Sequence, residues 1–315
     1  MADSSRASAA ASPESEVSAY RPLAFAIAYR MVGSVAETED IVQEAFLRLH
    51  RARQEGVVVE SPKAYLAALT TRLAIDHLRS ARVRRESYVG PWLPEPIIQE
   101  EEPALARQTE MAESVSMAFM LILEALSPVE RAVFLLREVF DYSYEEIAGV
   151  VEKSEENCRQ IFARAKRHID AGKRRFEASP AKRDEIAERF FAACQRGELD
   201  GLVRLLAADA AFYGDGGGKV AAVTRPVVGA DRVARLMAGI FARLEPSGIR
   251  IVRALVNGQA GAKLVDRDDR VVGVWSLDTV EGKVQCVRSV VNPEKLRHLG
   301  PVSDLLSLAR RRSGS

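Results

Sequence analysis

One segment near the middle of the chain, residues 143–169, constrains the fold most, because it reads as two short helices with a tight turn between them. Ser143 stands three residues before Glu146, which is the spacing of a capping box at the start of a helix. Apolar residues then recur at helical spacing. A second helix is predicted to bury Cys158 and Ile161 and to carry basic residues on its other faces.

Two helices that cross at such a turn form a helix-turn-helix, in which the second helix enters the major groove of DNA. An ordinary helical hairpin with a solvated basic face is the alternative. The usual turn glycine is absent, with Glu152 in its place, so the segment alone leaves both interpretations open. The residues predicted to contact DNA are Ser154, which is also the N-cap candidate of the second helix, Asn157, Arg159, Gln160, Arg164 and Arg167.

Composition narrows the class of protein without deciding it. At 315 residues the chain is long enough for two or three domains, and its formal net charge of only +1 is low for a nucleic-acid binder. The charge is uneven, however, because arginines crowd residues 72–85 whereas residues 100–102 are acidic. Local patches, and not the total charge, set the field that a phosphate meets.

The cysteines and the N-terminus bear on location. Cys158, Cys194 and Cys286 are odd in number, far apart and without metal-ligand spacing, which predicts reduced thiols and a cytoplasmic protein. The first residues are small and polar, lack the apolar core of a signal peptide and are expected to be disordered. No apolar run is long enough to span a bilayer, so we expect no membrane partner.

Residues 20–86 read as helical throughout. The first helix is expected at residues 22–32. A second, from Val35 to about Arg53, begins with the capping-box spacing of Ser34 and Glu37. A third starts at a serine–proline pair, which supplies a cap and a first helical residue, and it ends strongly basic.

The amino-acid sequence of the second and third of these helices is specific enough to suggest a family. The stretches AETEDIVQEAFLRLHRA and SPKAYLAALTTRLAIDHLRSARVRRE resemble region 2 of the extracytoplasmic-function sigma factors, the promoter-reading subunits of bacterial RNA polymerase. The resemblance implies that Asp40, Gln43, Glu44 and Arg48 bind the polymerase core. It also implies that the next helix reads the −10 element. For each of these charged residues taken alone, the alternative to a binding role is a place on a solvated helix face. The implied −10 residues are Arg72, Asp76, His77, Arg79, Arg82, Arg84 and Arg85.

A proline-rich segment follows, YVGPWLPEPIIQEEEPA, and its prolines and acids predict an extended linker. A free linker gains nothing from exposing a tryptophan, so one interpretation is that Trp92 and Leu93 dock on a domain surface. The alternative is a plain proline-rich spacer, and composition alone does not decide between the two. Residues 104–126 then read as a helix. Ser127, Pro128 and Glu130 predict the start of another, which leads into the helix-turn-helix. This unit resembles region 4 of the same family, whose second motif helix reads the −35 element.

The chain after the helix-turn-helix is predicted to have a different fold class, with strands as well as helices. Residues 184–207 and 231–244 read as helices, and several strands alternate with turns after residue 249. Helices followed by a curled antiparallel sheet suggest an α+β cone with an internal pocket. The pattern resembles the SnoaL-like branch of the nuclear-transport-factor-two (NTF2-like) fold, some members of which are enzymes.

Three short motifs, WLPEP, DGGGK and NPEKL, resemble signatures of the sigma factors with a fused SnoaL-like extension. In that group the extension replaces a separate anti-sigma factor and adjusts activity by touching the sigma core. We therefore expect an interdomain regulatory contact, with the cone packed against region 2 and the linker. The residues expected at or near it are Trp92, Leu93, Pro94, Glu95, Pro96, Asp215, Gly216, Gly217, Gly218, Lys219, Asn292, Pro293, Glu294, Lys295 and Leu296.

The predicted fold is multidomain, with two all-α sigma domains followed by an α+β SnoaL-like cone. The expected boundaries are a tail at 1–17, region 2 at 18–88, a linker at 89–116, region 4 at 117–176, the SnoaL-like domain at 177–300 and a tail at 301–315.

The predicted function is a sigma factor that binds the polymerase core and double-stranded promoter DNA and is regulated by its own extension. No nucleophile triad, metal cluster or paired carboxylate stands out, so we expect no catalysis, no metal and no cofactor. Two alternatives stay open. One is a SnoaL-like enzyme with Asp209 or Asp215 as base, and the other is a one-component DNA-binding regulator that senses a small ligand in the cone.

Overall fold

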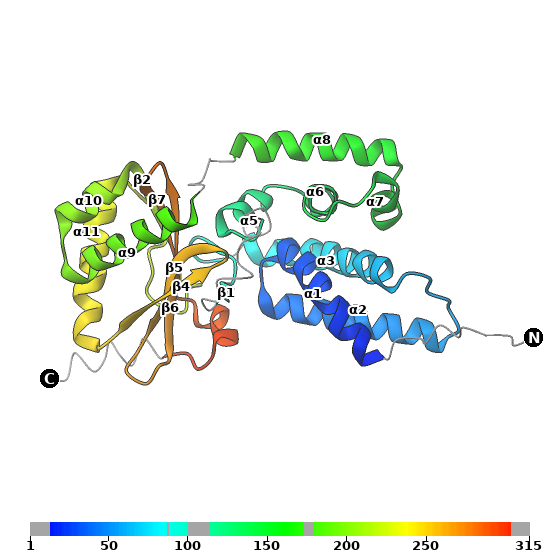
Figure 1. Ribbon diagram of the computed structural model, residues 1–315, viewed down its shortest axis with the longest axis horizontal. Coiled ribbons are helices and arrows are strands. Elements are labelled where there is room, and N and C mark those ends of the chain that lie inside the picture. The colour runs from blue at the N-terminus through cyan, green and yellow to red at the C-terminus, as the bar shows by residue number, and fades with distance from the viewer. Residues whose placement is uncertain (1–12, 87, 100–113, 173–178, 304–315) are drawn as a thin grey trace, which may run out of the picture.

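The computed structural model describes residues 13–86, 88–99, 114–172 and 179–303, and an all-helical part lies beside an α+β part (Figure 1). The predicted fold class is confirmed. Within these ranges, no helix combines the length and the apolar character that crossing a membrane requires.

The N-terminal helical domain consists of α1 (Pro13–Val32), α2 (Val35–Gln54) and α3 (Pro62–Glu86). The first helix begins earlier than predicted, and Pro22 lies inside it. Good helix formers precede this proline, and a proline can bend a helix without ending it. Gly33, with φ of +72°, separates α1 from α2.

The central helical domain contains α5 (Met117–Leu123), α6 (Pro128–Glu138), α7 (Tyr144–Val151) and α8 (Glu155–Gly172). The predicted capping boxes at Ser127 and Ser143 are both present. The tight turn between α7 and α8 is confirmed, and Glu152 ends α7 in the left-handed conformation, with φ of +55°. Part of the helix predicted at residues 104–126 lies outside the described residues.

The two helical domains share a hydrophobic core, in which α6 and α8 lie over α1–α3 (Figure 1). Met31 of α1 and Ile75 of α3 belong to the same buried cluster as Phe134 of α6 and Ile169 of α8. Two arginines reinforce the join, since Arg131 donates to the Met31 carbonyl and Arg30 donates to Ser114 Oγ at 2.9 Å. Burial lowers the pKa of Arg30 to about 10.

The C-terminal domain is a curved sheet covered by helices on one face (Figure 1). Its strand order is β1-β4-β5-β6-β7-β2-β3, and every pair is antiparallel except β2 with β7. The expectation of a purely antiparallel sheet is therefore wrong at one pair, because the chain between β2 and β7 contains α11 and four strands, which is long enough for a parallel crossover. Its elements are α9 (Pro180–Arg196), α10 (Leu199–Leu205), β2 (Leu206–Asp215), β3 (Val227–Val228), α11 (Ala230–Leu244), β4 (Arg250–Val256), β5 (Gln259–Val265), β6 (Val271–Val280) and β7 (Lys283–Val290).

Large aromatic side chains fill the space between the sheet and its helices. Trp275 packs against Phe191, Phe212 and Phe241, with ring centroids 5.2–6.4 Å apart. These rings occupy part of the space in which the cone is predicted to hold an internal pocket, and a cavity of about 200 Å³ lies beside Phe241 and Ile251. The linker contributes an edge strand to this sheet, β1 (Ile98–Gln99), which pairs with β4 at the edge farthest from β3.

Candidate functional site

The outer face of α2 carries the residues expected to bind polymerase. Asp40, Gln43 and Arg48 are exposed, and Glu44 is half-buried and accepts from Arg48 Nε at 2.6 Å. Leu47 lies on the same strip and is 43% exposed, which is unusual for a leucine beside a well-packed core. The sequence analysis missed Leu47, although its spacing from Asp40 and Gln43 places it on their face.

The outer face of α8 carries the residues expected to contact DNA. Its core side buries Cys158 and Ile161 as predicted. Ser154 caps the helix by accepting from the Asn157 amide at 3.2 Å, so its role here is in the helix terminus. The predicted residues that the structure leaves exposed on α8 are Asn157, Arg159, Gln160, Arg164 and Arg167.

Two of these arginines are held by acids within the central domain. Arg159 lies 2.7 Å from Glu155, and its guanidinium also stacks on Tyr144 at 5.2 Å from the ring centroid. Arg164 Nε donates to Glu130 Oε1 at 2.6 Å. Burial opposes ionisation of Glu130, but hydrogen bonds from Ser127 and Arg164 outweigh it and lower the pKa of that carboxyl.

The residues expected at the −10 element are not equivalent. Asp76 and Arg79 are exposed and pair with each other at 3.3 Å. His77 is half-buried, and its Nε2 lies 2.9 Å from Glu37 Oε2 on α2. The backbone of residues 82–85 belongs to α3, but the side chains of Arg82, Arg84 and Arg85 lie outside the described residues.

Arg72 joins the two helical domains. Its Nε donates to the Val150 carbonyl at 2.9 Å, and its Nη2 donates to the Gly149 carbonyl at 2.7 Å. Glu152 is within 3.5 Å. A cation at the C-terminus of a helix interacts favourably with the helix dipole and with the last carbonyls. In this arrangement Arg72 therefore closes the N-terminal domain onto α7 and is not directed to DNA.

Replacing Arg72 by alanine is expected to lower the free energy of unfolding by about 1 kcal/mol, because two hydrogen bonds of a half-exposed guanidinium are lost. Arg79→Ala is the matched control, since Arg79 lies on the same helix and pairs only within it among the described residues. Its effect is expected to stay within about 0.5 kcal/mol. Equal effects of both changes in urea denaturation would mean that the hydrogen bonds from Arg72 to α7 do not stabilise the fold.

The three short motifs meet at one place, called here the motif contact, where residues 92–96, 215–219 and 292–296 lie together. Glu95 is its link to the N-terminal domain. Its carboxylate accepts from Ser34 Oγ at 2.8 Å and from the Val35 amide at 2.7 Å, at the N-terminus of α2. A negative charge is favourable there. The linker thus supplies part of the cap of the helix that carries the polymerase-binding face.

Asp215 is the centre of the motif contact and is fully buried. Its Oδ2 accepts from the Leu93 amide at 2.8 Å and from Lys295 Nζ at 2.7 Å, and its Oδ1 accepts from the Tyr88 hydroxyl. Lys295 also lies 4.4 Å from the Trp92 ring centroid. One carboxylate therefore connects the linker, the end of β2 and the segment after β7.

The glycines of DGGGK allow this close approach. Lys219 N donates to the Gly216 carbonyl at 2.9 Å, so the turn predicted there is present, although a longer loop follows before β3. A Cβ on Gly217 would lie 2.2 Å from Asn292 Nδ2, and φ at Gly217 is +58°. No larger residue fits this position without moving Asn292.

The motif contact has an apolar base. Leu93, Met117 and Leu296 are buried in one cluster with residues of β6 and β7. Pro94 and Pro96 are buried beside it, and the Pro96 carbonyl lies 2.8 Å from His298 Nε2. Asn292 caps a short 3-10 turn that begins at Pro293 and returns the chain to this cluster. On the surface, Glu294 pairs with Lys219 at 3.3 Å.

Trp92 and Leu93 therefore dock on the C-terminal domain, Leu93 in this apolar cluster and Trp92 against Lys295. The interpretation of the linker as a plain spacer is wrong.

Several contact residues were not foreseen. Tyr88 donates to Asp215, and burial, followed by this carboxylate, raises the pKa of the Tyr88 hydroxyl. Asn257 Nδ2 donates to the Tyr29 hydroxyl at 2.7 Å, and that hydroxyl donates to the Glu95 carbonyl. Burial is also the main cause that raises the pKa of Tyr29. No local pattern marks these residues, because their partners are distant in the sequence.

Comparisons with known proteins cover all three parts of the chain. Family models match as Sigma-70 region 2 over residues 17–84, Sigma-70, region 4 over residues 116–169, and a SnoaL-like domain over residues 187–287.

Two relatives and one solved structure span nearly the whole chain. The chain is 37% identical to the ECF RNA polymerase sigma factor SigJ of Mycobacterium tuberculosis, over 89% of this chain and 92% of that protein. It is 31% identical to the probable ECF RNA polymerase sigma factor SigI of that species, over 88% and 92%. The crystal structure of Mycobacterium tuberculosis SigJ matches with a TM-score of 0.71 and 33% identity, covering 90% of this chain and 98% of that one.

Proposed function

This chain belongs to the extracytoplasmic-function sigma factors with a fused SnoaL-like domain, and we propose that it directs RNA polymerase to promoters under the control of that domain. Its partners are the polymerase core and double-stranded promoter DNA, and it acts in the cytoplasm, where transcription takes place. The N-terminal helical domain serves as region 2, the central helical domain as region 4, and the C-terminal domain as the regulator.

The observation that carries the proposal is the pair of exposed polar faces on α2 and α8. Each helix buries an apolar side in a core and leaves its other side to solvent. On α2 the exposed strip combines Asp40, Gln43 and Glu44 with Leu47, a composition that suits a protein surface with an apolar centre and a charged rim. On α8 it combines arginines with Gln160 and Asn157, which suit base edges and phosphates.

Reversing the charge of the α2 face tests polymerase binding. The double change Asp40→Arg and Glu44→Arg is expected to weaken binding of the purified core at least tenfold, because the surface meets its partner with the opposite charge. Asp200→Arg with Asp231→Arg changes the net charge equally on exposed positions of the C-terminal domain and is the matched control. Undiminished binding by the α2 variant would contradict the proposal that this face of α2 binds polymerase.

For the −10 element, we propose that Asp76 and Arg79 are accessible in the arrangement described, whereas Arg72 and His77 have partners within the chain. Arg72 becomes available only when α7 moves away from α3. This supports a regulated state in which part of the promoter-reading surface is held by the protein itself.

The regulatory role of the C-terminal domain rests on the motif contact. Glu95 joins it to α2, and Met117 joins its apolar base to α5, so one contact touches both helical domains. We propose that it holds these domains in a relation that does not match the spacing of the −35 and −10 elements. Polymerase and promoter then compete with the closed arrangement, which requires no separate inhibitor.

Catalysis is not part of the proposal. Of the two candidate bases, Asp215 is fully buried, and its carboxylate holds Tyr88, Leu93 and Lys295. A general base must be within reach of a substrate proton, and Asp215 is not. Asp209 is exposed on β2, and its carboxylate accepts from the Gln285 side chain at 2.9 Å. A ligand role for the C-terminal domain is better supported than an enzymatic one.

A further inference from the structure

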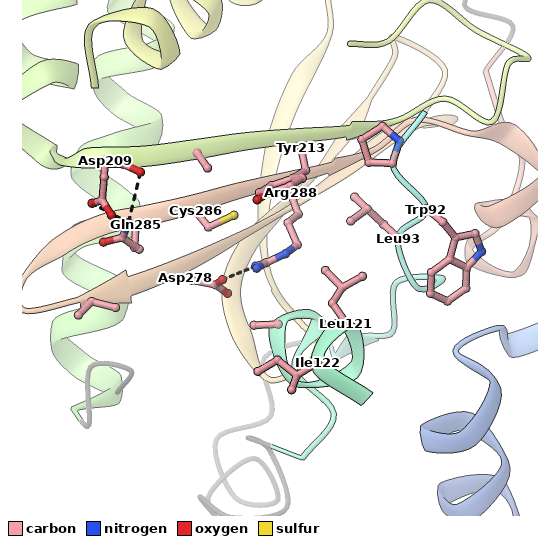
Figure 2. Close-up of a pocket in the computed structure, with 14 residues that line it drawn as sticks. Trp92, Leu93, Leu121, Ile122, Asp209, Tyr213, Asp278, Gln285, Cys286 and Arg288 are labelled. Carbon is pink, nitrogen blue, oxygen red and sulfur yellow. Dashed lines mark hydrogen bonds and ion pairs between the residues drawn. The ribbon is translucent and has the colours of Figure 1, made fainter. Parts of the chain in front are cut away.

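A cavity of about 480 Å³ lies between the C-terminal domain, the linker and α5, and it is called here the seam pocket (Figure 2). The sheet contributes Asp278 and Arg288, the linker contributes Trp92, and α5 contributes Leu121 and Ile122. This volume falls within the range of small-molecule sites in proteins. The cavity beside Phe241 and Ile251 is less than half as large.

The seam pocket faces the side of the sheet that the covering helices do not occupy. Successive residues of a strand point to opposite faces. On β6, Leu277 belongs to the core under the helices, whereas Asp278 lines the seam pocket. On β7, Val287 and Arg288 divide in the same way. The seam pocket is therefore distinct from the internal pocket that a SnoaL-like cone predicts.

A buried ion pair forms the polar part of its wall. Asp278 and Arg288 are 4% and 7% exposed, and Arg288 Nη1 donates to Asp278 Oδ2 (Figure 2). Within the described chain, Asp278 Oδ1 and Arg288 Nε have no hydrogen-bond partner. Buried polar atoms are rarely left in this condition in native proteins. An acceptor and a donor without partners thus lie close together just behind the cavity wall, where protein atoms cover both, and a ligand group reaches them when the two side chains turn toward the seam pocket.

These two atoms define the ligand chemistry. A neutral group with an adjacent donor and acceptor, such as a carboxamide, can donate to Asp278 and accept from Arg288. A carboxylate ligand would meet the Asp278 charge, and an ammonium ligand would meet the Arg288 charge. The remaining wall, which includes Trp92, Leu93, Leu121 and Ile122, suits an apolar or aromatic body.

We propose that the seam pocket binds a compact, largely apolar molecule with a neutral amide-type group, and that binding stabilises the closed arrangement. Its walls come from three segments that meet only when the motif contact is formed, so a ligand prefers that state and shifts the population toward it. The regulatory half of this inference rests on the proposed sigma function, whereas the binding half does not.

Binding is tested on the full chain without polymerase, by ligand-observed NMR titration with benzamide and 1-naphthamide. At least one amide is expected to bind. Its matched carboxylate, benzoate or 1-naphthoate, is expected to lose a factor of about ten or more in affinity, since it cannot donate to Asp278. Ala211→Phe fills the seam pocket from β2 and is expected to abolish binding. Ile249→Phe fills the smaller cavity and is the matched control.

Three results would overturn the site: no binding by either amide, which leaves water as the occupant; equal binding of amides and carboxylates; or undiminished binding by Ala211→Phe. With core polymerase, the bound amide is expected to lower transcription by the unchanged protein and not by Ala211→Phe. Unaltered output despite binding would overturn the regulatory half. A chain that binds the amide but directs no transcription would instead contradict the proposed sigma function.

Discussion

Replacing Lys295 by methionine is expected to open the motif contact. The change keeps most of the apolar stem but removes the ammonium that pairs with Asp215 at 2.7 Å. Both side chains are buried, at 9% and 0% exposure, so Asp215 would remain as an uncompensated charge. Breaking a buried pair in this way costs about 3–5 kcal/mol. That is enough to expose the linker, because the closed and open arrangements differ only by an interface within one chain.

Two measurements follow this opening. Hydrogen exchange at the Leu93 and Asn292 amides, which both donate to Asp215, is expected to accelerate by more than a hundredfold. Transcription from a cognate promoter is expected to rise, because the closed arrangement no longer competes with polymerase. Lys219→Met is the matched control, since the exposed pair of Lys219 with Glu294 contributes about 1 kcal/mol or less. If both variants behave alike, the buried pair does not hold the contact.

Replacing Arg159, Gln160 and Arg164 together by alanine is expected to abolish discrimination of the −35 element. Each side chain that makes a good bidentate base contact supplies about 1–3 kcal/mol of discrimination, which is roughly fivefold to a hundredfold. All three side chains are exposed on α8, and the structure adds that Arg159 and Arg164 must leave Glu155 and Glu130 to reach DNA.

The measurement compares binding of the polymerase holoenzyme to a promoter with an intact and with a scrambled −35 element at several salt concentrations. A residue that contacts only phosphate would weaken both promoters and lower the salt slope by about one. Gln195, Arg232 and Arg235, replaced together by alanine, form a control of identical composition on exposed positions of the C-terminal domain. Intact −35 discrimination in the α8 variant would mean that another surface reads this element.

The parts of the fold that the sequence predicts are those with local signals. The capping boxes at Ser127 and Ser143 are complete within four residues, and both form as predicted. The strands β4–β7 alternate with turns along the sequence, and each lies within a few residues of its predicted place. The three motifs could be assigned to one contact because of a family resemblance, and not because their residue types require it.

The parts that the sequence does not predict depend on partners that are far apart along the chain. The spacing of Ser34 and Glu37 predicts a reciprocal capping box, but in the structure Glu95 receives the Ser34 hydroxyl and the first amide of α2. Arg72 resembles a DNA-binding arginine in its sequence context, and only the packing of α7 reveals its carbonyl partners. Both outcomes follow from tertiary structure that no local pattern encodes.

The placement of the tryptophans makes the protein its own optical reporter. The chain contains two, and Trp275 is 2% exposed in a core that the closed and open arrangements share. Trp92 instead lies against Lys295 and Gly33 at the motif contact. Any red shift of the intrinsic emission when the motif contact opens in the isolated chain, as expected for Lys295→Met, therefore comes from one known indole. With Trp275→Phe the signal reduces to a single fluorophore, whose lifetime would report the fraction of closed molecules in real time.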